Sequence, residues 1–157
     1  MLTIEHSRSH RLGLSVSIVI VDADHFKSYN ARYGHPAGDT CLQRITGAIE
    51  SVLRRPSDMA ARWGGEEFVV LLPGADEIGA VQVAHGIRAA VRTLGVPHTD
   101  GKTGVMTVSL GVAAAGPGQW MEESALIARA DQALYEVKRS GRDAVRAGQL
   151  QAKRLSD

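Results

Sequence analysis

The chain has little cysteine, no long apolar run and no signal for export. Its 157 residues include a single cysteine, Cys41, which cannot form an internal disulfide and therefore fits a reducing compartment. Cys41 lies in an apolar helical pattern, which favours a buried hydrophobic role over a nucleophilic one. The longest apolar run, Val16 to Val21, is too short to span a membrane, and the polar residues 1–11 contain no signal-peptide core. We expect a cytoplasmic protein with no membrane segment in this chain.

The chain also lacks an excess of charge of either sign. It has 18 basic and 17 acidic residues, which give a net charge of +1. No block of like charges indicates a nucleic-acid arm or a membrane-surface patch, so we expect no nucleic-acid polymer as a partner. An anionic ligand must therefore be bound by a few placed cations and not by a broad positive field.

Apolar patterns divide the sequence into alternating strands and helices. The first strand is β-branched and nearly continuous, which indicates that both of its faces are covered, whereas the last predicted strand alternates as if one face were covered. The predicted strands are residues 16–21, 59–63, 67–72 and 105–113, and the predicted helices are residues 25–33, 37–53, 76–94 and 123–139. This order predicts an α+β domain with a βαββαβ core, a mainly antiparallel sheet flanked by helices that we place on one side.

Two acidic clusters follow predicted strands. Asp22 and Asp24 come at the end of the first strand, and Glu66 and Glu67 lie at a predicted hairpin. If the strands are neighbours, the carboxylates converge, and a hard divalent cation such as Mg²⁺ would relieve their repulsion. The alternative is that they are solvated loop acids. The adjacent Gly64-Gly65 is either a plain hairpin tip or a place where backbone amides can approach a phosphate.

Five motifs in order make the pattern specific. Together they span about residues 14 to 143 and resemble the GGDEF family of diguanylate cyclases, in its GGEEF form. The motifs are Asp22–Lys27, similar to D-x-D-x-F-K; Asn30–Asp39, similar to N-D-x-x-G-H-x-x-G-D; Gly64–Phe68, the GGEEF signature; Val108–Ala113, similar to S-x-G-V-A; and Ala130–Asp143, similar to A-D-x-A-L-Y-x-x-K-x-x-G-R-N. The resemblance implies a nucleotidyl cyclase palm, related to the ferredoxin-like fold, that condenses two GTP into cyclic di-GMP and two pyrophosphates.

The resemblance also implies roles for individual residues. Its metal would be Mg²⁺, with Mn²⁺ as a substitute. The implied metal ligands are Asp22, the main-chain carbonyl of Ala23 and Glu66, with Glu67 as an additional ligand, and Glu66 is also the candidate base for the attacking ribose 3′-hydroxyl. The implied substrate-binding residues are Lys27, Asn30, Asp39, Gly65, Lys138 and Arg142.

Several of these roles have ordinary structural alternatives. Lys138 and Arg142 would bind the terminal phosphates, but cations at the end of a helix also suit its dipole. Asn30 and Asp39 would select guanine, because a carboxylate accepts from its adjacent N–H donors and repels the acceptor nitrogen of adenine. Without the family, Asn30 would be a helix-end or turn residue and Asp39 an acid near a helix N-terminus. Lys27 is either a phosphate ligand or a surface residue.

Arg55-Pro56-Ser57-Asp58 is separated from Gly64 by five residues. It resembles the family's R-x-x-D site, at which the product cyclic di-GMP binds away from catalysis and inhibits. Arg55 and Asp58 are the implied contacts. The alternative is a turn closed by a salt bridge.

The resemblance has limits. Residues 1–13 lack the usual opening motif and are interpreted as an eroded or truncated segment, residues 14–146 as the GGDEF domain, and residues 147–157 as a tail. Ala31 and Asp143 replace a usual Asp and a usual Asn. Because one domain binds one GTP, the family's reaction requires a homodimer with facing sites. The alternative function is a catalytically weak receptor domain for GTP or cyclic di-GMP.

Overall fold

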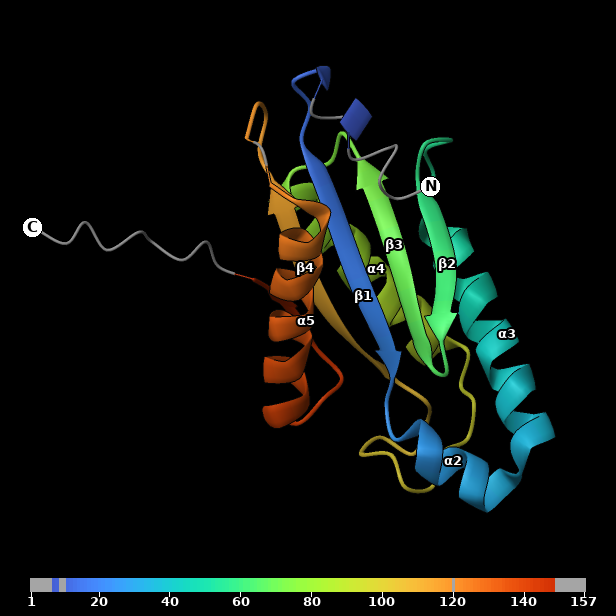
Figure 1. Cartoon of the computed structure of the whole chain (residues 1–157). Coiled ribbons are helices and arrows are strands. Elements are labelled where there is room, and N and C mark those ends of the chain that lie inside the picture. The colour runs from blue at the N-terminus through green and yellow to red at the C-terminus, as the bar shows by residue number, and fades with distance from the viewer. Residues whose placement is uncertain (1–6, 9–10, 120, 149–157) are drawn as a thin grey trace, which may run out of the picture.

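A computed structural model describes residues 7–8, 11–119 and 121–148 of the chain (Figure 1). Its sheet has five strands in the order β2-β3-β1-β4-β5, antiparallel except for the parallel pair of β4 and β5. The elements in chain order are β1 (Val16–Ala23), α2 (Phe26–Tyr33), α3 (His35–Val52), β2 (Met59–Gly64), β3 (Glu67–Pro73), α4 (Glu77–Thr93), β4 (Val108–Ala115), α5 (Glu123–Arg139) and β5 (Val145–Ala147). The predicted α+β fold with a mainly antiparallel sheet is confirmed.

Helices cover both faces of the sheet, so the expectation that they lie on one side was wrong. Val19 and Val21 of β1 pack in the apolar cluster that contains the inner faces of α3 and α4, whereas Ile18 and Ile20 pack in the cluster of α5 (Figure 1). All eight residues of β1 are buried, as its continuous apolar sequence predicted. A strand that is apolar on both faces must be covered on both, so the helices form two layers, one on each face of the sheet.

The close contact between α5 and β4 depends on Gly111. A side chain at Gly111 would collide with the backbone of Ala130 and Leu134, so only glycine lets the helix approach the strand this closely. Met106, Val108, Leu110 and Val112 face the α3 and α4 layer, as their alternation predicted, but the other face is covered too, because Ala113 and Ala115 pack in the cluster of α5. This packing sets where the end of α5 lies relative to the end of β1.

β5 was not predicted from the sequence. It pairs in parallel with β4, and the amide of Gly148 donates to the carbonyl of Val112 at 2.7 Å, so the described part of the proposed tail continues the sheet. Residues 149–157 of that tail, and residues 1–6 and 9–10 of the proposed N-terminal segment, lie outside the described residues. Across the described residues, no helix is long and apolar enough to cross a membrane.

Cys41 is a core residue of α3. Its side chain is buried among apolar neighbours, and this burial raises the pKa of the thiol to about 11. A thiol with so high a pKa carries almost no thiolate at neutral pH, which agrees with the predicted hydrophobic role.

Candidate active site

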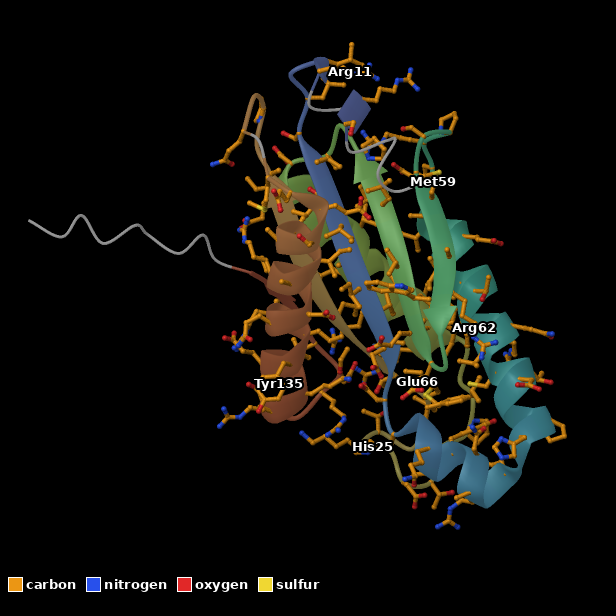
Figure 2. The ribbon with its side chains drawn as sticks, in the orientation of Figure 1. Arg11, His25, Met59, Arg62, Glu66 and Tyr135 are labelled. Carbon is orange, nitrogen blue, oxygen red and sulfur yellow. The ribbon has the colours of Figure 1, made fainter. Side chains whose placement is uncertain are left out.

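Four segments meet at the carboxyl end of β1. Asp22 pairs in register with Glu67 of β3 on one side and with Ser109 of β4 on the other, and the amide of Ala23 donates to the carbonyl of Glu66 at 3.2 Å. Figure 2 labels Glu66 and His25 at this end of the sheet. A cavity opens here, lined by Asp22, Ala23, His25, Phe26, Lys27, Ser28, Ala31, Glu66, Lys138 and Arg142. Six of the residues selected from the sequence therefore line one cavity.

Asp22 is a buried carboxylate with a cationic partner. Lys138 of α5 donates to its Oδ2 at 2.7 Å, across 116 residues of sequence. Burial raises the pKa of Asp22, and the hydrogen bond and charge of Lys138 oppose that rise without cancelling it. Burial also raises the pKa of Glu67, and the neighbouring charge of Asp22 raises it further. The carboxylates are therefore crowded and partly dehydrated: the charge of Glu66 disfavours ionisation of Asp22, and the charge of Asp22 disfavours ionisation of Glu67.

This donor set suits a hard cation. Among the described residues, no three side chains of His, Cys, Asp and Glu are grouped as in an all-protein metal cage. Mg²⁺ does not need such a cage, because it commonly binds one or two carboxylates together with waters and substrate phosphates. Asp22, Glu66 and the carbonyl of Ala23 lie at the same cavity edge and can supply the protein's share. The chemistry of the site therefore fits the predicted metal.

Two cations from α5 and the residues after it also line the cavity. Lys138 is half-buried, and Arg142 follows the helix with a left-handed backbone φ of 66°. Such a conformation costs a residue other than glycine about 1 kcal/mol, so the surroundings must hold it in place. Lys27 of α2 is exposed and also lines the cavity. The amide of Gly65 lies at the hairpin tip, where φ is 52° and where a Cβ would meet no described atom within 4 Å.

Asn30 and Asp39 lie together at the junction of α2 and α3, outside the cavity lining. The side chain of Asn30 occupies the space that a Cβ of Gly38 would need, and Asp39 follows directly on the exposed side of α3. Among the described residues, no donor reaches the buried Oδ1 of Asn30. A buried acceptor left unpaired is costly, so this oxygen is a place where a ligand N–H group could bind. Asp39 is the fifth residue of α3, so it does not cap that helix.

Comparison with known proteins identifies the family of this chain. The family model described as "Diguanylate cyclase, GGDEF domain" matches residues 1–144. The chain belongs to the GGDEF family. It is 42% identical over 139 residues to the diguanylate cyclase DgcP of Pseudomonas aeruginosa, covering 88% of this chain and 20% of that protein. It is 40% identical over 131 residues to diguanylate cyclase A of Treponema denticola, covering 83% and 34%. The chain thus spans a fifth to a third of the length of these relatives.

Solved structures agree with this assignment to the GGDEF family. The GGDEF domain of DgcB from Caulobacter crescentus, solved in complex with cyclic di-GMP, superposes with a TM-score of 0.83 at 32% identity, covering 94% of this chain and 85% of that one. The active GGEEF domain of a diguanylate cyclase from Vibrio cholerae superposes with a TM-score of 0.81 at 27% identity, covering 96% and 93%. The nucleotidyl cyclase type of palm predicted from the motifs is therefore confirmed.

The Arg55–Asp58 pair of this GGDEF domain lies far from the cavity. Arg55 donates from Nη2 to Asp58 Oδ1 at 3.1 Å and to the carbonyl of Pro73 at 2.9 Å. Asp58 immediately precedes β2, whose other end leads into Gly65 and Glu66, so the two sites lie at opposite ends of that strand. Figure 2 labels Met59 and Glu66, which mark these ends. The turn salt bridge exists, and a regulatory use of the same residues stays a prediction.

The sequence analysis did not recognise the role of Asp24. It is not a solvated loop acid, because its carboxylate is buried and accepts from Thr107 Oγ1 at 2.7 Å, Ser109 Oγ at 2.6 Å and the amide of Asp143 at 3.1 Å. The cavity-lining residues His25, Phe26, Ser28 and Ala31 were also not selected. His25 and Phe26 stand at a variable and an apolar motif position, Ser28 lies between two motifs, and Ala31 has no polar side chain, so the sequence carried no signal for them.

The raised pKa values predict that metal binding at this site depends on pH. Asp22 and Glu67 take up protons at a higher pH than ordinary carboxyls, and a proton competes with the metal. Mg²⁺ affinity should therefore be full at pH 8 and fall as the pH drops through the raised pKa values, by up to about tenfold per pH unit below them. Calorimetric titration between pH 8 and pH 5 measures this. A Mg²⁺ affinity that stays flat from pH 8 to pH 5 would contradict the expectation.

Proposed function

We propose that this GGDEF domain is a diguanylate cyclase, which condenses two GTP into cyclic di-GMP and releases two pyrophosphates. One observation carries the proposal: the carboxylates Asp22 and Glu66 and the cations Lys138 and Arg142 line one cavity, although they come from three separate parts of the chain. A triphosphate that binds together with a metal ion needs carboxylates for the metal and basic side chains for the phosphates, side by side. A receptor for cyclic di-GMP alone would have no use for the carboxylates.

The proposed roles follow from charge and position. Asp22, Glu66 and the Ala23 carbonyl hold the metal, with Glu67 next to them. When bound, Mg²⁺ supplies positive charge that neutralises the triphosphate and stabilises the leaving pyrophosphate. Lys138 exchanges its bond to Asp22 for the terminal phosphates, which Arg142 also binds. Lys27 and the amide of Gly65 contribute further donors to the phosphate chain.

Proton transfer and base choice complete the proposal. Glu66 accepts the proton of the ribose 3′-hydroxyl as its oxygen attacks the α-phosphate of the GTP on the facing domain, and pyrophosphate leaves from that phosphorus. Asn30 and Asp39 bind the guanine edge, and the unpaired Oδ1 of Asn30 supports this position for the base. A site whose acceptors must pair with N–H donors of the base discriminates strongly against adenine.

A single assay tests the function. The domain is incubated at high protein concentration with GTP and Mg²⁺, and the products are separated by chromatography. Cyclic di-GMP should appear with two pyrophosphates per molecule, and neither ATP in place of GTP nor GTP with a chelator should give a cyclic dinucleotide. Tight binding of GTP or cyclic di-GMP without any product would instead establish the receptor function.

We also propose that Arg55 and Asp58 bind cyclic di-GMP as an inhibitor. The guanidinium of Arg55 is half-exposed next to Asp58, so it can present a fork of donors to a phosphate or a guanine edge. Because β2 lies between this pair and the cavity, cyclic di-GMP would bind at Arg55 and Asp58 without occupying the catalytic site.

Arg55→Ala should raise the inhibition constant of cyclic di-GMP by roughly tenfold or more, the value of lost hydrogen bonds to a charged partner, and leave the initial rate near that of the wild type. Inhibition curves of the enzyme measure this. Arg54→Ala, the same change one residue earlier, is the matched control. Thermal melts are needed as well, because Arg55→Ala leaves the buried Asp58 without this partner. Overlaid inhibition curves would mean that the motif is only a turn.

A further inference from the structure

The residues that follow α5 have an unusual backbone. Arg142 and Asp143 have φ values of 66° and 50°, so two consecutive residues other than glycine are left-handed. The turn before them is the ordinary end of a helix: Gly141 has a positive φ of 116°, and the amide of Arg142 donates to the carbonyl of Val137 at 2.9 Å, in a six-to-one bond. That bond ends the helix, but it does not account for the left-handed backbone of the next two residues.

Two contacts hold Asp143 in this conformation. Its amide donates to Asp24 Oδ2 at 3.1 Å, and Arg88 of α4 donates from Nε to both the carbonyl and Oδ1 of Asp143, each at 2.9 Å. The backbone of Asp143 is therefore fixed on its N–H side by a buried carboxylate and on its C=O side by a guanidinium. Arg142, one residue earlier, cannot change its backbone without breaking one of these bonds.

The anchors are themselves rigid. Asp24 is held by two hydroxyls of the β4 segment, and the buried His98 donates from Nε2 to the carbonyl of Asp24 at 3.2 Å. The side chain of Arg88 on α4 is 31% exposed, and the side chain of Asp143 is 14% exposed. A charge-assisted contact in this partly buried setting is stronger than a surface ion pair.

We propose that Arg88 is a positioning residue, which acts through Asp143 to aim Arg142 at the terminal phosphates of GTP. The inference rests on the proposed function, because it takes Arg142 as a phosphate ligand. Asp24 fixes the same loop from the other side, and it follows directly after Ala23, whose carbonyl is the proposed metal ligand. The two ends of the triphosphate site are thus joined by one hydrogen-bonded network.

The chain offers its own control. Arg92 is one turn further along α4 and approaches the other carboxylate oxygen of Asp143, but only at 3.9 Å and with its side chain 52% exposed. It reaches the same residue and carries the same charge, but the hydrogen bond to the backbone carbonyl of Asp143 comes from Arg88. If the effect of Arg88 were one of local charge, Arg92 would share it; if the effect comes from fixing the backbone, Arg92 would not.

The test compares Arg88→Met with Arg92→Met. Binding to the Mg²⁺-loaded domain is measured by calorimetry for GMP and for a GTP analogue with a methylene between its α- and β-phosphates, which cannot lose pyrophosphate. Arg88→Met should weaken the triphosphate on the order of tenfold and leave GMP unchanged, since GMP lacks the terminal phosphates. Arg92→Met should bind both nucleotides like the wild type. Asp143→Asn, which keeps the amide bond to Asp24 and an acceptor for Arg88, should fall between wild type and Arg88→Met.

Three results overturn the inference. Equal triphosphate affinity in Arg88→Met and wild type would show that Arg142 needs no such support. An equal loss for GMP and for the triphosphate would show a general structural role, and a lower melting temperature should accompany it. A wild-type domain that binds neither nucleotide would overturn the proposed function itself, and this inference with it.

Discussion

Glu66→Gln should abolish synthesis of cyclic di-GMP while the domain stays folded. The substitution keeps the size of the side chain and removes its negative charge, so both proposed roles of Glu66, as metal ligand and as base, are lost together. A positioned general base alone contributes about 10²- to 10⁴-fold, and weakened metal binding adds to this, so kcat should fall by at least about 10³-fold. The measurement is the initial rate of pyrophosphate release at saturating GTP and Mg²⁺.

The structure gives a reason for the fold to survive this change. The contact of Glu66 with β1 is made by its main-chain carbonyl, which accepts from the amide of Ala23, and Gln keeps that carbonyl. The side chain is only partly buried, at the edge of the cavity. Glu50→Gln, which removes one exposed carboxylate from α3, is the matched control and should retain the wild-type rate. Near-normal synthesis by a folded Glu66→Gln domain would rule out its proposed role.

The sequence was sufficient to predict the central part of this fold. The continuous β-branched run of β1 predicted a strand buried on both faces, and the structure follows from it: a central strand with helices on each side. The error in helix placement arose from the alternation in β4. Serine and glycine on one face of a strand appear solvent-facing in a sequence, but Ser109 bonds the buried Asp24, and Gly111 makes room for α5.

β5 was beyond the reach of local patterns for a physical reason. Three residues, Val145 to Ala147, are too few to show a period, and a parallel partner lies far away along the chain. Its position depends on tertiary contacts, such as the bond from the amide of Leu110 to the carbonyl of Ala144 at 3.0 Å. Strand propensity contributes little to a segment of this length.

The site could be predicted by motif but not by geometry. Asp22 and Asp24 are equivalent in the sequence, and the donors that separate them come from other parts of the chain: Lys138 for Asp22, and Ser109 with the Asp143 amide for Asp24. The roles of Arg88 and Asp143 depend on the loop after α5, which brings Asp143 within hydrogen-bond distance of Arg88 on α4. No spacing rule connects residues 55 positions apart, so only the folded structure shows their contact.

The largest gain in rate should come from joining two copies of the domain. The cavity that contains Asp22 and Glu66 can serve one GTP, whereas the product contains two nucleotides joined by two equivalent phosphodiester bonds. The proposed reaction therefore requires two domains that face each other at the carboxyl ends of their β1 strands, so that each 3′-hydroxyl attacks the α-phosphate held by the partner. Specific activity should rise with protein concentration until the paired state is saturated.

A coiled coil fused before Leu14 would supply the pairing. Leu14 is exposed and lies two residues before β1, a strand of eight residues and roughly 26 Å that ends at the cavity, so a short flexible linker is needed to let the cavities face. Linkage of this kind gives the second domain an effective concentration in the millimolar range, so at micromolar protein the rate per domain should rise by about 100-fold or more. A fusion with a Gly-Ser segment of equal length, which cannot dimerise, should leave the rate unchanged. Turnover that does not depend on protein concentration, in a species shown to be monomeric by ultracentrifugation, would exclude the facing-domain mechanism.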